Sequence, residues 1–245
     1  MSTTAVRIAL VTGANKGLGF ETSRQLAQQG ITVLMAGRSS TRGKAAANKL
    51  RDEGLSARFI QLDVTKPEQI RNAVSEIKRR YGKVDILVNN AGTSVDEAHG
   101  HNSTETVSIK ALRKTFDVNF FGLVELTQKL LPLIKKSDAG RIVNVSSILG
   151  SMMIHSGQGG MSYKPFAYDA SKTCVNAFTI HLAAAFSGTN VKINSAHPGW
   201  VRTDMGGSGA PLSPEEGART AVRLATLDAN GPTGKFFHGE NELPW

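Results

Sequence analysis

Cysteine and long apolar runs are nearly absent from this sequence of 245 residues. Cys174 is its one cysteine, so no disulfide can form within the chain and no cysteine-based metal site is expected. The six histidines show no HExxH or similar ligand spacing. No stretch approaches the roughly 20 apolar residues that span a bilayer. We therefore expect neither a bound metal nor a membrane segment.

Clustered positive charge is also lacking, although the net charge is +9. No block of Lys and Arg is longer than three residues, and no aromatic residues are interleaved with the basic ones. Dispersed charge indicates a solvated surface with some attraction for a polyanionic cofactor, rather than a nucleic-acid-binding face. Residues 1–6 lack the charged and then apolar layout of a signal peptide, so we expect a cytoplasmic protein.

Short apolar runs alternate with longer helical patterns along the chain. This alternation predicts βαβ units, and hence an α/β fold with one doubly wound, Rossmann-type parallel sheet of about seven strands and helices on both faces. With no internal repeat or linker, we expect a single domain over residues 1–245. Strands are expected at 8–11, 32–36, 58–62, 86–88, 141–145, 191–195 and 235–238, and helices at 17–29, 41–53, 66–81, 109–131, 166–186 and 214–227.

Several residues mark the ends of these elements. Gly30 is expected to cap the first helix, Thr65 to begin the third, and Pro132 to follow the fourth. Residues 151–165 and 200–213 contain short glycine-rich stretches. We expect an insertion and a mobile loop there, both over a binding site.

A glycine-rich turn follows the first expected strand and leads into a helix. It reads Thr12-Gly13-Ala14-Asn15-Lys16-Gly17-Leu18-Gly19, with the spacing Gly-x-x-x-Gly-x-Gly. Glycines let backbone N–H groups approach a pyrophosphate, whose charge a helix N-terminus favours. The residues expected to bind a dinucleotide here are Gly13, Asn15, Lys16, Gly17, Leu18 and Gly19.

The residue after the second strand distinguishes NAD from NADP. An NAD site usually has Asp or Glu there, to bind the ribose 2′-hydroxyl. Arg38 stands in that place, 19 residues after Gly19. A guanidinium can hold a 2′-phosphate through two hydrogen bonds, and Lys16 can add a second charge. Unless both are ordinary surface cations, the cofactor is NADP(H).

Two further strand ends are candidate cofactor contacts. Asp63 and Val64 follow the third strand, where Asp63 either binds the adenine amino group or caps the next helix. Asn89-Asn90-Ala91-Gly92 follows the fourth strand. There the backbone of Asn90, Ala91 and Gly92 can approach the cofactor, and the Asn side chains can also bridge strands.

Tyr168 and Lys172 lie four residues apart in an expected helix, so they share a face. A free tyrosine has a pKa of about 10 and is a poor acid–base catalyst near neutral pH. A neighbouring ammonium favours the phenolate and lowers that pKa. This spacing is common by chance, so the pair is a catalytic candidate only because it follows the fifth strand of a dinucleotide-binding fold.

Polar residues nearby complete the candidate site. Ser146 and Ser147 end the fifth strand, where a hydroxyl can bind a substrate carbonyl, although both can also be plain turn residues. Asn119 lies within an apolar helical segment and needs a partner. It either holds a water that reprotonates the tyrosine–lysine pair or braces a kink.

Together these motifs resemble the short-chain dehydrogenase/reductase superfamily. The match runs in order over nearly the whole chain. It comprises the glycine turn, Asn89–Gly92, Asn119, Ser147, Tyr168-x-x-x-Lys172 and Pro198-Gly199. Within the superfamily, the segments 197–205 and 213–218 and the terminal Trp245 are similar to animal carbonyl reductases and related plant reductases.

The resemblance implies roles for individual residues. Ser147, Tyr168 and Lys172 would form the catalytic triad, with Asn119 as a fourth member. Ser147 is preferred to Ser146 because the second of such a pair usually fills the family position. The residues that would border the nicotinamide are Pro198, Gly199, Val201 and Thr203, with Thr203 contacting the carboxamide.

The spacing before Tyr168 departs from the superfamily. Ser147 and Tyr168 are 21 positions apart, a wider gap than is usual, yet narrower than in animal carbonyl reductases. Residues 151–165 are therefore an intermediate insertion near helices through which many members pair, which leaves a monomer and a homo-oligomer both open. Tyr163 lacks a lysine partner, because residue 167 is alanine. The expected substrate pocket comprises Ser147, Leu149, Met153, Tyr163, Trp200 and Met205.

The resemblance thus implies an NADPH-dependent carbonyl reductase that transfers a hydride to small aldehydes or ketones. Tyr168 would donate the proton, Lys172 would lower its pKa and hold the nicotinamide ribose, and Ser147 would orient the carbonyl. A 3-oxoacyl-thioester reductase and a hydroxysteroid-type dehydrogenase are the alternatives among enzymes. The intact triad argues against an NADPH-sensing regulator, and the dispersed charge argues against a nucleic-acid-binding protein.

Overall fold

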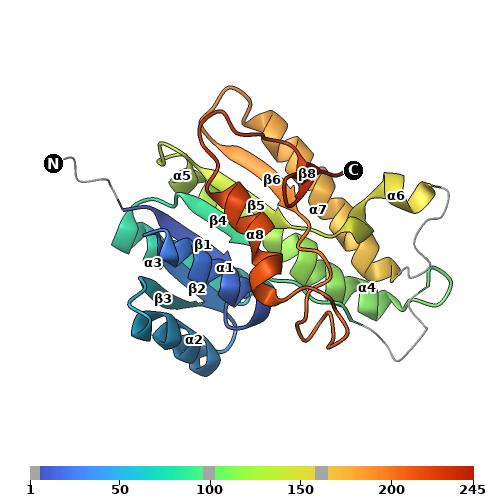
Figure 1. Cartoon of the computed structure of the whole chain (residues 1–245), viewed down its shortest axis with the longest axis horizontal. Coiled ribbons are helices and arrows are strands. Elements are labelled where there is room, and N and C mark those ends of the chain that lie inside the picture. Colours follow the sequence, from blue (N-terminus) through green and yellow to red (C-terminus); the bar gives the residue numbers. More distant parts are fainter. Residues whose placement is uncertain (1–5, 96–102, 158–164) are drawn as a thin grey trace.

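The computed structural model describes residues 6–95, 103–157 and 165–245, and its centre is one eight-stranded sheet (Figure 1). The strand order is β3-β2-β1-β4-β5-β6-β7-β8. All neighbouring pairs are parallel except β7 with β8. The strands are β1 (Ile8–Thr12), β2 (Thr32–Gly37), β3 (Ala57–Gln61), β4 (Ile86–Asn89), β5 (Arg141–Val145), β6 (Lys192–Ala196), β7 (Phe236–His238) and β8 (Asn241–Glu242).

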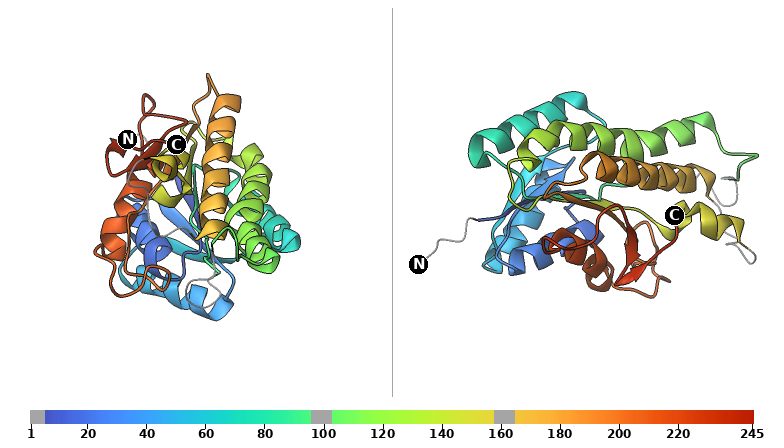
Figure 2. Two further views of the ribbon diagram at one scale, coloured as in Figure 1. Left: turned by 90° about the vertical axis from the view of Figure 1, so that its right-hand side faces the viewer. Right: turned by 90° about the horizontal axis from the view of Figure 1, so that it is seen from above.

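Helices cover both faces of this sheet (Figure 2). Along β1, Ala9 and Val11 pack with α1, α2 and α8, whereas Ile8 and Leu10 pack with α3, α5 and α7. This alternation is expected for a strand that is buried on both faces. The helices are α1 (Gly17–Gln28), α2 (Ser40–Asp52), α3 (Pro67–Tyr81), α4 (Ile109–Phe116), α5 (Gly122–Ile134), α6 (Met152–Ser156), α7 (Phe166–Ala185) and α8 (Pro214–Ala225).

The predicted doubly wound α/β fold is confirmed. From β1 the chain builds β2 and β3 on one side, and it then returns to place β4 on the other side. The strand order therefore reverses between β1 and β4, and the crevice at their carboxyl ends is where such folds bind ligands. No described helix is long and apolar enough to cross a membrane.

Some details of the predicted elements differ in the structure. The short antiparallel β8 adds an eighth strand, and its two residues are both exposed, so it has no apolar pattern. Lys66, not Thr65, precedes the first turn of α3, because the Thr65 hydroxyl donates to Asp63. Helix α5 continues through Pro132 to Ile134, since a proline this near the end disrupts little of the helix. The glycine at position 30 has the expected positive φ, +77°.

The expected single helix over 109–131 is interrupted. A π-helical turn, Asp117–Phe121, separates α4 from α5. It lies just before Gly122, where a β-carbon would stand 2.4 Å from the Val64 carbonyl oxygen. Such turns often occur at functional sites. This one carries Asn119, which is buried.

Arg141, at the start of β5, is the largest fully buried side chain among the described residues. Its guanidinium donates to the carbonyl oxygens of Leu227, Asp228, Asn190 and Gly140 at 2.8–3.0 Å. It thereby ties the loops after α7 and α8 to the sheet. Burial lowers the pKa of this group, yet a guanidinium stays charged near neutral pH.

We expect Arg141→Met to lower the free energy of unfolding by about 3 kcal/mol, because buried carbonyls lose their charged donor. Urea unfolding at neutral pH measures this loss. Arg219→Met, at an exposed position on α8, is the matched control and should change stability little. Equal stability of the two variants would show that the buried guanidinium contributes nothing net.

Candidate active site

The glycine turn and the turn after β4 are joined by hydrogen bonds around Thr12. The Thr12 hydroxyl accepts from the backbone N–H groups of Asn90 and Ala91, both at 2.9 Å. The Asn90 amide donates to the carbonyl oxygen of Thr12 at 2.7 Å. A β-carbon on Gly19 would lie 2.4 Å from that amide, so only glycine lets α1 begin this close to β4.

The start of α1 fits an anionic group. No side chain caps its N-terminus, and its first turn contains no acidic residue. Gly13 and Gly17 have φ values of +65° and +55°, which a glycine adopts without strain. Backbone N–H groups are thus exposed at a helix N-terminus, as a pyrophosphate requires. The Asn89 side chain bridges neighbouring elements, as predicted: its amide donates to Asn144 on β5 and to Thr127 on α5, both at 2.9 Å.

Ser147, Tyr168 and Lys172 are brought together at the carboxyl edge of the sheet. The Ser147 side chain lies close enough to the Tyr168 hydroxyl to lower its pKa. The ammonium of Lys172 lies 5.6 Å from the centre of the Tyr168 ring and donates to Val145 O at 2.7 Å. Ser146 instead faces the backbone of Lys172, its hydroxyl 3.5 Å from that carbonyl oxygen. The geometry therefore favours Ser147 of the two serines.

Helix α7 places Tyr168 and Lys172 on one face, beside a close backbone contact. A β-carbon on Gly150 would lie 2.7 Å from the Lys172 carbonyl carbon, so the turn Ile148–Gly150 packs directly on α7. A β-carbon on Gly92 would lie 3.8 Å from the Lys172 ammonium. The turn after β4 therefore also lies beside the Lys172 ammonium.

The contacts of Asn119 are those of a brace. Its side-chain oxygen accepts from Thr93 N at 2.8 Å, and its amide donates to Thr93 O at 2.9 Å and to Ser171 Oγ at 3.0 Å. It thus joins the π-helical turn to the β4 loop and to α7. These bonds explain how a polar residue is accommodated in an apolar helix.

The expected lowering of the Tyr168 pKa does not occur in this arrangement. Burial raises the pKa of Tyr168 to about 12, the Ser147 hydrogen bond acts to lower it, and the charge of Asp169 raises it further. Burial lowers the pKa of Lys172 to about 8. Desolvation is the largest cause of the shift for both groups. Tyr168 therefore keeps its proton near neutral pH, as a proton donor must.

The predicted 2′-phosphate residues, Lys16 and Arg38, follow the carboxyl ends of β1 and β2. Arg38 is exposed at the end of β2. Lys16 is paired with Asp204 from the loop after β6, and this pairing lowers the pKa of the Asp204 carboxyl. Arg42, on α2, also acts on Asp204, which places a third cation nearby. The sequence analysis did not assign Arg42 and Asp204 to this site, because only the folded chain brings these charged residues beside Lys16.

The remaining predicted cofactor residues lie around the same edge. Asp63 accepts from the backbone and hydroxyl of Thr65, at 3.0 and 2.8 Å, so its local role is to shape the turn before α3. Val64 is buried against Gly122. A β-carbon on Gly17 would lie 3.2 Å from the Thr203 methyl group, so the loop after β6 reaches the glycine turn.

His197 was not predicted as a site residue, although it directly precedes the Pro198-Gly199 pair. Its Nδ1 accepts from the backbone N–H groups of Ile148 and Gly199 at 3.3 and 3.4 Å. Burial, with a smaller effect of His238, lowers its pKa to about 4. A neutral imidazole thus links the loops after β5 and β6.

The predicted substrate residues are only partly brought together. Met153, Trp200 and Met205 are 67%, 60% and 50% exposed, and the Trp200 ring donates to Gly206 O at 2.8 Å. Leu149 lies beside Ser147. Tyr163 lies outside the described residues. Residues 152–156, within the predicted insertion, form the short helix α6.

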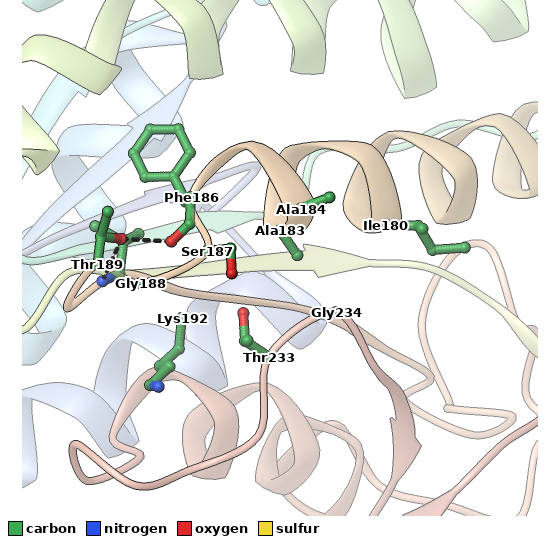
Figure 3. Close-up of a pocket in the computed structure, with 11 residues that line it drawn as sticks. Ile180, Ala183, Ala184, Phe186, Ser187, Gly188, Thr189, Lys192, Thr233 and Gly234 are labelled. Carbon is green, nitrogen blue, oxygen red and sulfur yellow. Dashed lines mark hydrogen bonds between the residues drawn. The ribbon is translucent and has the colours of Figure 1, made fainter.

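A surface hollow of about 270 Å³ lies elsewhere, at the far end of α7 (Figure 3). It is bordered by Phe186, Ser187, Lys192 and Thr233. Tyr168 is 16 residues earlier in the helix than Ala184, which corresponds to roughly 24 Å along its axis. The hollow is therefore separate from the candidate active site.

This fold, with a glycine turn between β1 and α1 and a tyrosine–lysine pair on α7, defines a dinucleotide-dependent oxidoreductase. The sequence profile of the short chain dehydrogenase family matches residues 7–211, and the chain belongs to that family. It is 37% identical over 284 residues to "Carbonyl reductase [NADPH] 1" of Mus musculus, covering 97% of this chain and 98% of the relative.

Two solved structures are similar over nearly their whole lengths. Salutaridine reductase from Papaver somniferum has a TM-score of 0.81 at 31% identity, covering 94% of this chain and 99% of the other. An NADPH-bound carbonyl reductase from chicken fatty liver has a TM-score of 0.84 at 25% identity, covering 98% and 99%.

Proposed function

We propose that this protein is an NADPH-dependent carbonyl reductase that reduces small aldehydes or ketones to alcohols. The observation that carries this proposal is the placement of the buried Lys172 ammonium 5.6 Å from the centre of the Tyr168 ring, with the Ser147 hydroxyl beside that tyrosine. These groups lie at the carboxyl edge of the sheet, next to the turn after β4. NADPH, when bound, supplies the hydride for the carbonyl carbon.

The chain's own residues would handle the proton. Ser147 donates a hydrogen bond to the carbonyl oxygen and orients it toward Tyr168. Tyr168, which keeps its proton because burial raises its pKa to about 12, donates it to the developing alkoxide. The Lys172 ammonium then stabilises the phenolate through its charge. Its other N–H donors are proposed to hold the ribose hydroxyls.

The cofactor would lie along the crevice between β1 and β4. The glycine turn and the start of α1 would hold the pyrophosphate, and Arg38 with Lys16 would hold the 2′-phosphate. Lys16 must then exchange its pairing with Asp204 for the phosphate. The backbone of Asn90–Gly92 and the loop Pro198–Thr203 would border the nicotinamide half.

An NADPH-oxidation screen tests the proposed activity. The panel should contain quinones, aromatic aldehydes, cyclic ketones, 1,2-diketones, 3-oxoacyl thioesters and a 3-oxosteroid. Turnover of simple aldehydes or ketones would support the proposal. Turnover of the thioesters or the steroid alone would favour the corresponding specialised reductase, and no turnover of any carbonyl would contradict it.

Arg38→Asp should lower the preference for NADPH over NADH by about 100-fold, because a carboxylate repels the 2′-phosphate and can bind a 2′-hydroxyl instead. The ratio of kcat/KM for the two cofactors measures the change. Arg58→Asp, at an exposed position on neighbouring β3, is the control. An unchanged ratio in Arg38→Asp would remove Arg38 from the phosphate site.

A further inference from the structure

The side chain of His155 lies between the two segments that carry the proposed catalytic hydroxyls. Its Nε2 is 2.7 Å from Leu149 O and 3.5 Å from Asp169 Oδ2. The backbone N–H of Leu149 donates to Ser147 Oγ at 3.2 Å. Asp169 directly follows Tyr168 on α7. One imidazole therefore contacts Leu149, which is bonded to Ser147, and Asp169, which adjoins Tyr168.

The contact with Leu149 places a proton on Nε2 of His155. A carbonyl oxygen only accepts, so Nε2 must carry the proton that it gives to Leu149. The side chains of His155 and Asp169 are only 15% and 11% exposed, so the carboxylate is largely removed from water. A buried carboxylate needs charged or hydrogen-bonding neighbours. His155 is placed to supply one of them.

The charge of Asp169 matters because of its neighbour. It acts on Tyr168 in the direction that disfavours the phenolate. Proton donation requires that this phenolate form. A positive or proton-donating group beside Asp169 therefore offsets the unfavourable effect of this carboxylate on the Tyr168 phenolate.

Helix α6 has other anchors besides His155. Ser151 Oγ accepts from Ile154 N at 3.2 Å, and Met153 N donates to Trp245 O at 2.9 Å. Trp245 stacks on Phe236 with ring centres 5.7 Å apart. The end of the chain thus lies beside α6 (Figure 2). Loss of the His155 ring should leave this helix in place.

We propose that His155 is a positioning residue for proton transfer: it holds the Ser147 and Tyr168 segments together and balances the Asp169 carboxylate. The role rests on the proposed function, and it assigns the insertion before Tyr168 a part in catalysis. His155 acts through Asp169 and Leu149 and does not touch the substrate.

The test is a double-mutant cycle with His155→Ala, Asp169→Asn and the double variant. His155→Ala should lower kcat about 10- to 30-fold and leave the Kd of NADPH unchanged, because the glycine turn is untouched. In the Asp169→Asn background, the same change should lower kcat less than threefold, since no carboxylate remains to be balanced. The fall in Tm caused by His155→Ala should likewise be smaller in that background. His181→Ala, at an exposed position on α7, is the control.

Unchanged kcat in His155→Ala would overturn the proposal. So would equal losses in both backgrounds, because they would show a role that does not involve Asp169. If His155→Ala does not fold, His155→Gln replaces it in the cycle and keeps a donor for Leu149. An inactive wild-type chain would instead contradict the proposed reductase function, and the Tm cycle would still report the His155–Asp169 coupling.

Discussion

Replacing Tyr168 with phenylalanine is expected to lower kcat for carbonyl reduction by about 1,000-fold. The variant keeps the ring but loses the hydroxyl that is proposed to donate the proton and that lies beside Ser147. The Kd of NADPH should stay within about twofold, because the glycine turn and Arg38 bind the cofactor without this hydroxyl. NADPH oxidation with the best substrate of the screen measures the first effect, and fluorescence titration measures the second.

Tyr81→Phe is the matched control, since it removes a phenolic hydroxyl at the end of α3. It should retain wild-type kcat. A Tyr168→Phe enzyme with full activity would remove Tyr168 from the reaction. Loss of NADPH binding together with activity would instead point to a general disruption of the site.

The fold was largely predictable because each buried strand is a short apolar run and each helix has an apolar face. β1 to β7 lie close to their predicted ranges. β8 was missed because its two residues, Asn241 and Glu242, are exposed and pair only at the sheet edge. Helix α6 was missed because its few residues bury no continuous face.

The catalytic candidates were predictable only through the order of the motifs. The spacing of Tyr168 and Lys172 shows that they share a helical face, but tertiary contacts place Ser147 beside them. The same contacts bring His155, from the insertion, to Asp169. No motif in the sequence marks His155 or Asp169, because their pairing depends on where α6 packs.

The direction in which the Tyr168 pKa is shifted could not be predicted from the sequence either. A lysine four residues away predicts a lowered pKa, yet desolvation depends on what covers the site. Burial dominates for both groups and moves the pKa of Tyr168 up and that of Lys172 down. The pair therefore enters the reaction as a protonated tyrosine and a lysine that titrates near physiological pH.

Activity is therefore expected to fall as pH rises through about 8, and Lys172 should be the cause. Its pKa of about 8 means that the ammonium is present below this pH and lost above it. Tyr168, with a pKa of about 12, keeps its proton through pH 10 and cannot produce this limb. The pH dependence of kcat/KM measures the decline, which should approach tenfold per pH unit.

Lys172→Met should lower kcat about 100-fold and abolish that alkaline limb, because no charge remains to titrate. As pH rises over the same range, the free energy of unfolding of the wild type should increase while its activity falls. A lysine that titrates at 10.5 when unfolded and at about 8 when folded binds more protons in the unfolded state between these values. Wild-type stability therefore rises over that range, by up to about 3 kcal/mol, and the variant lacks the rise.

Lys129→Met, at an exposed position on α5, should leave both the pH profile and the stability unchanged. Lys172→Met should fold at neutral pH with a Tm no lower than wild type, because it no longer buries a charge, even though Val145 O loses its donor. A large fall in Tm would mean that the lost activity reflects unfolding. An alkaline limb that persists in Lys172→Met would assign the titration to another group and would separate the lysine from the proton-transfer step.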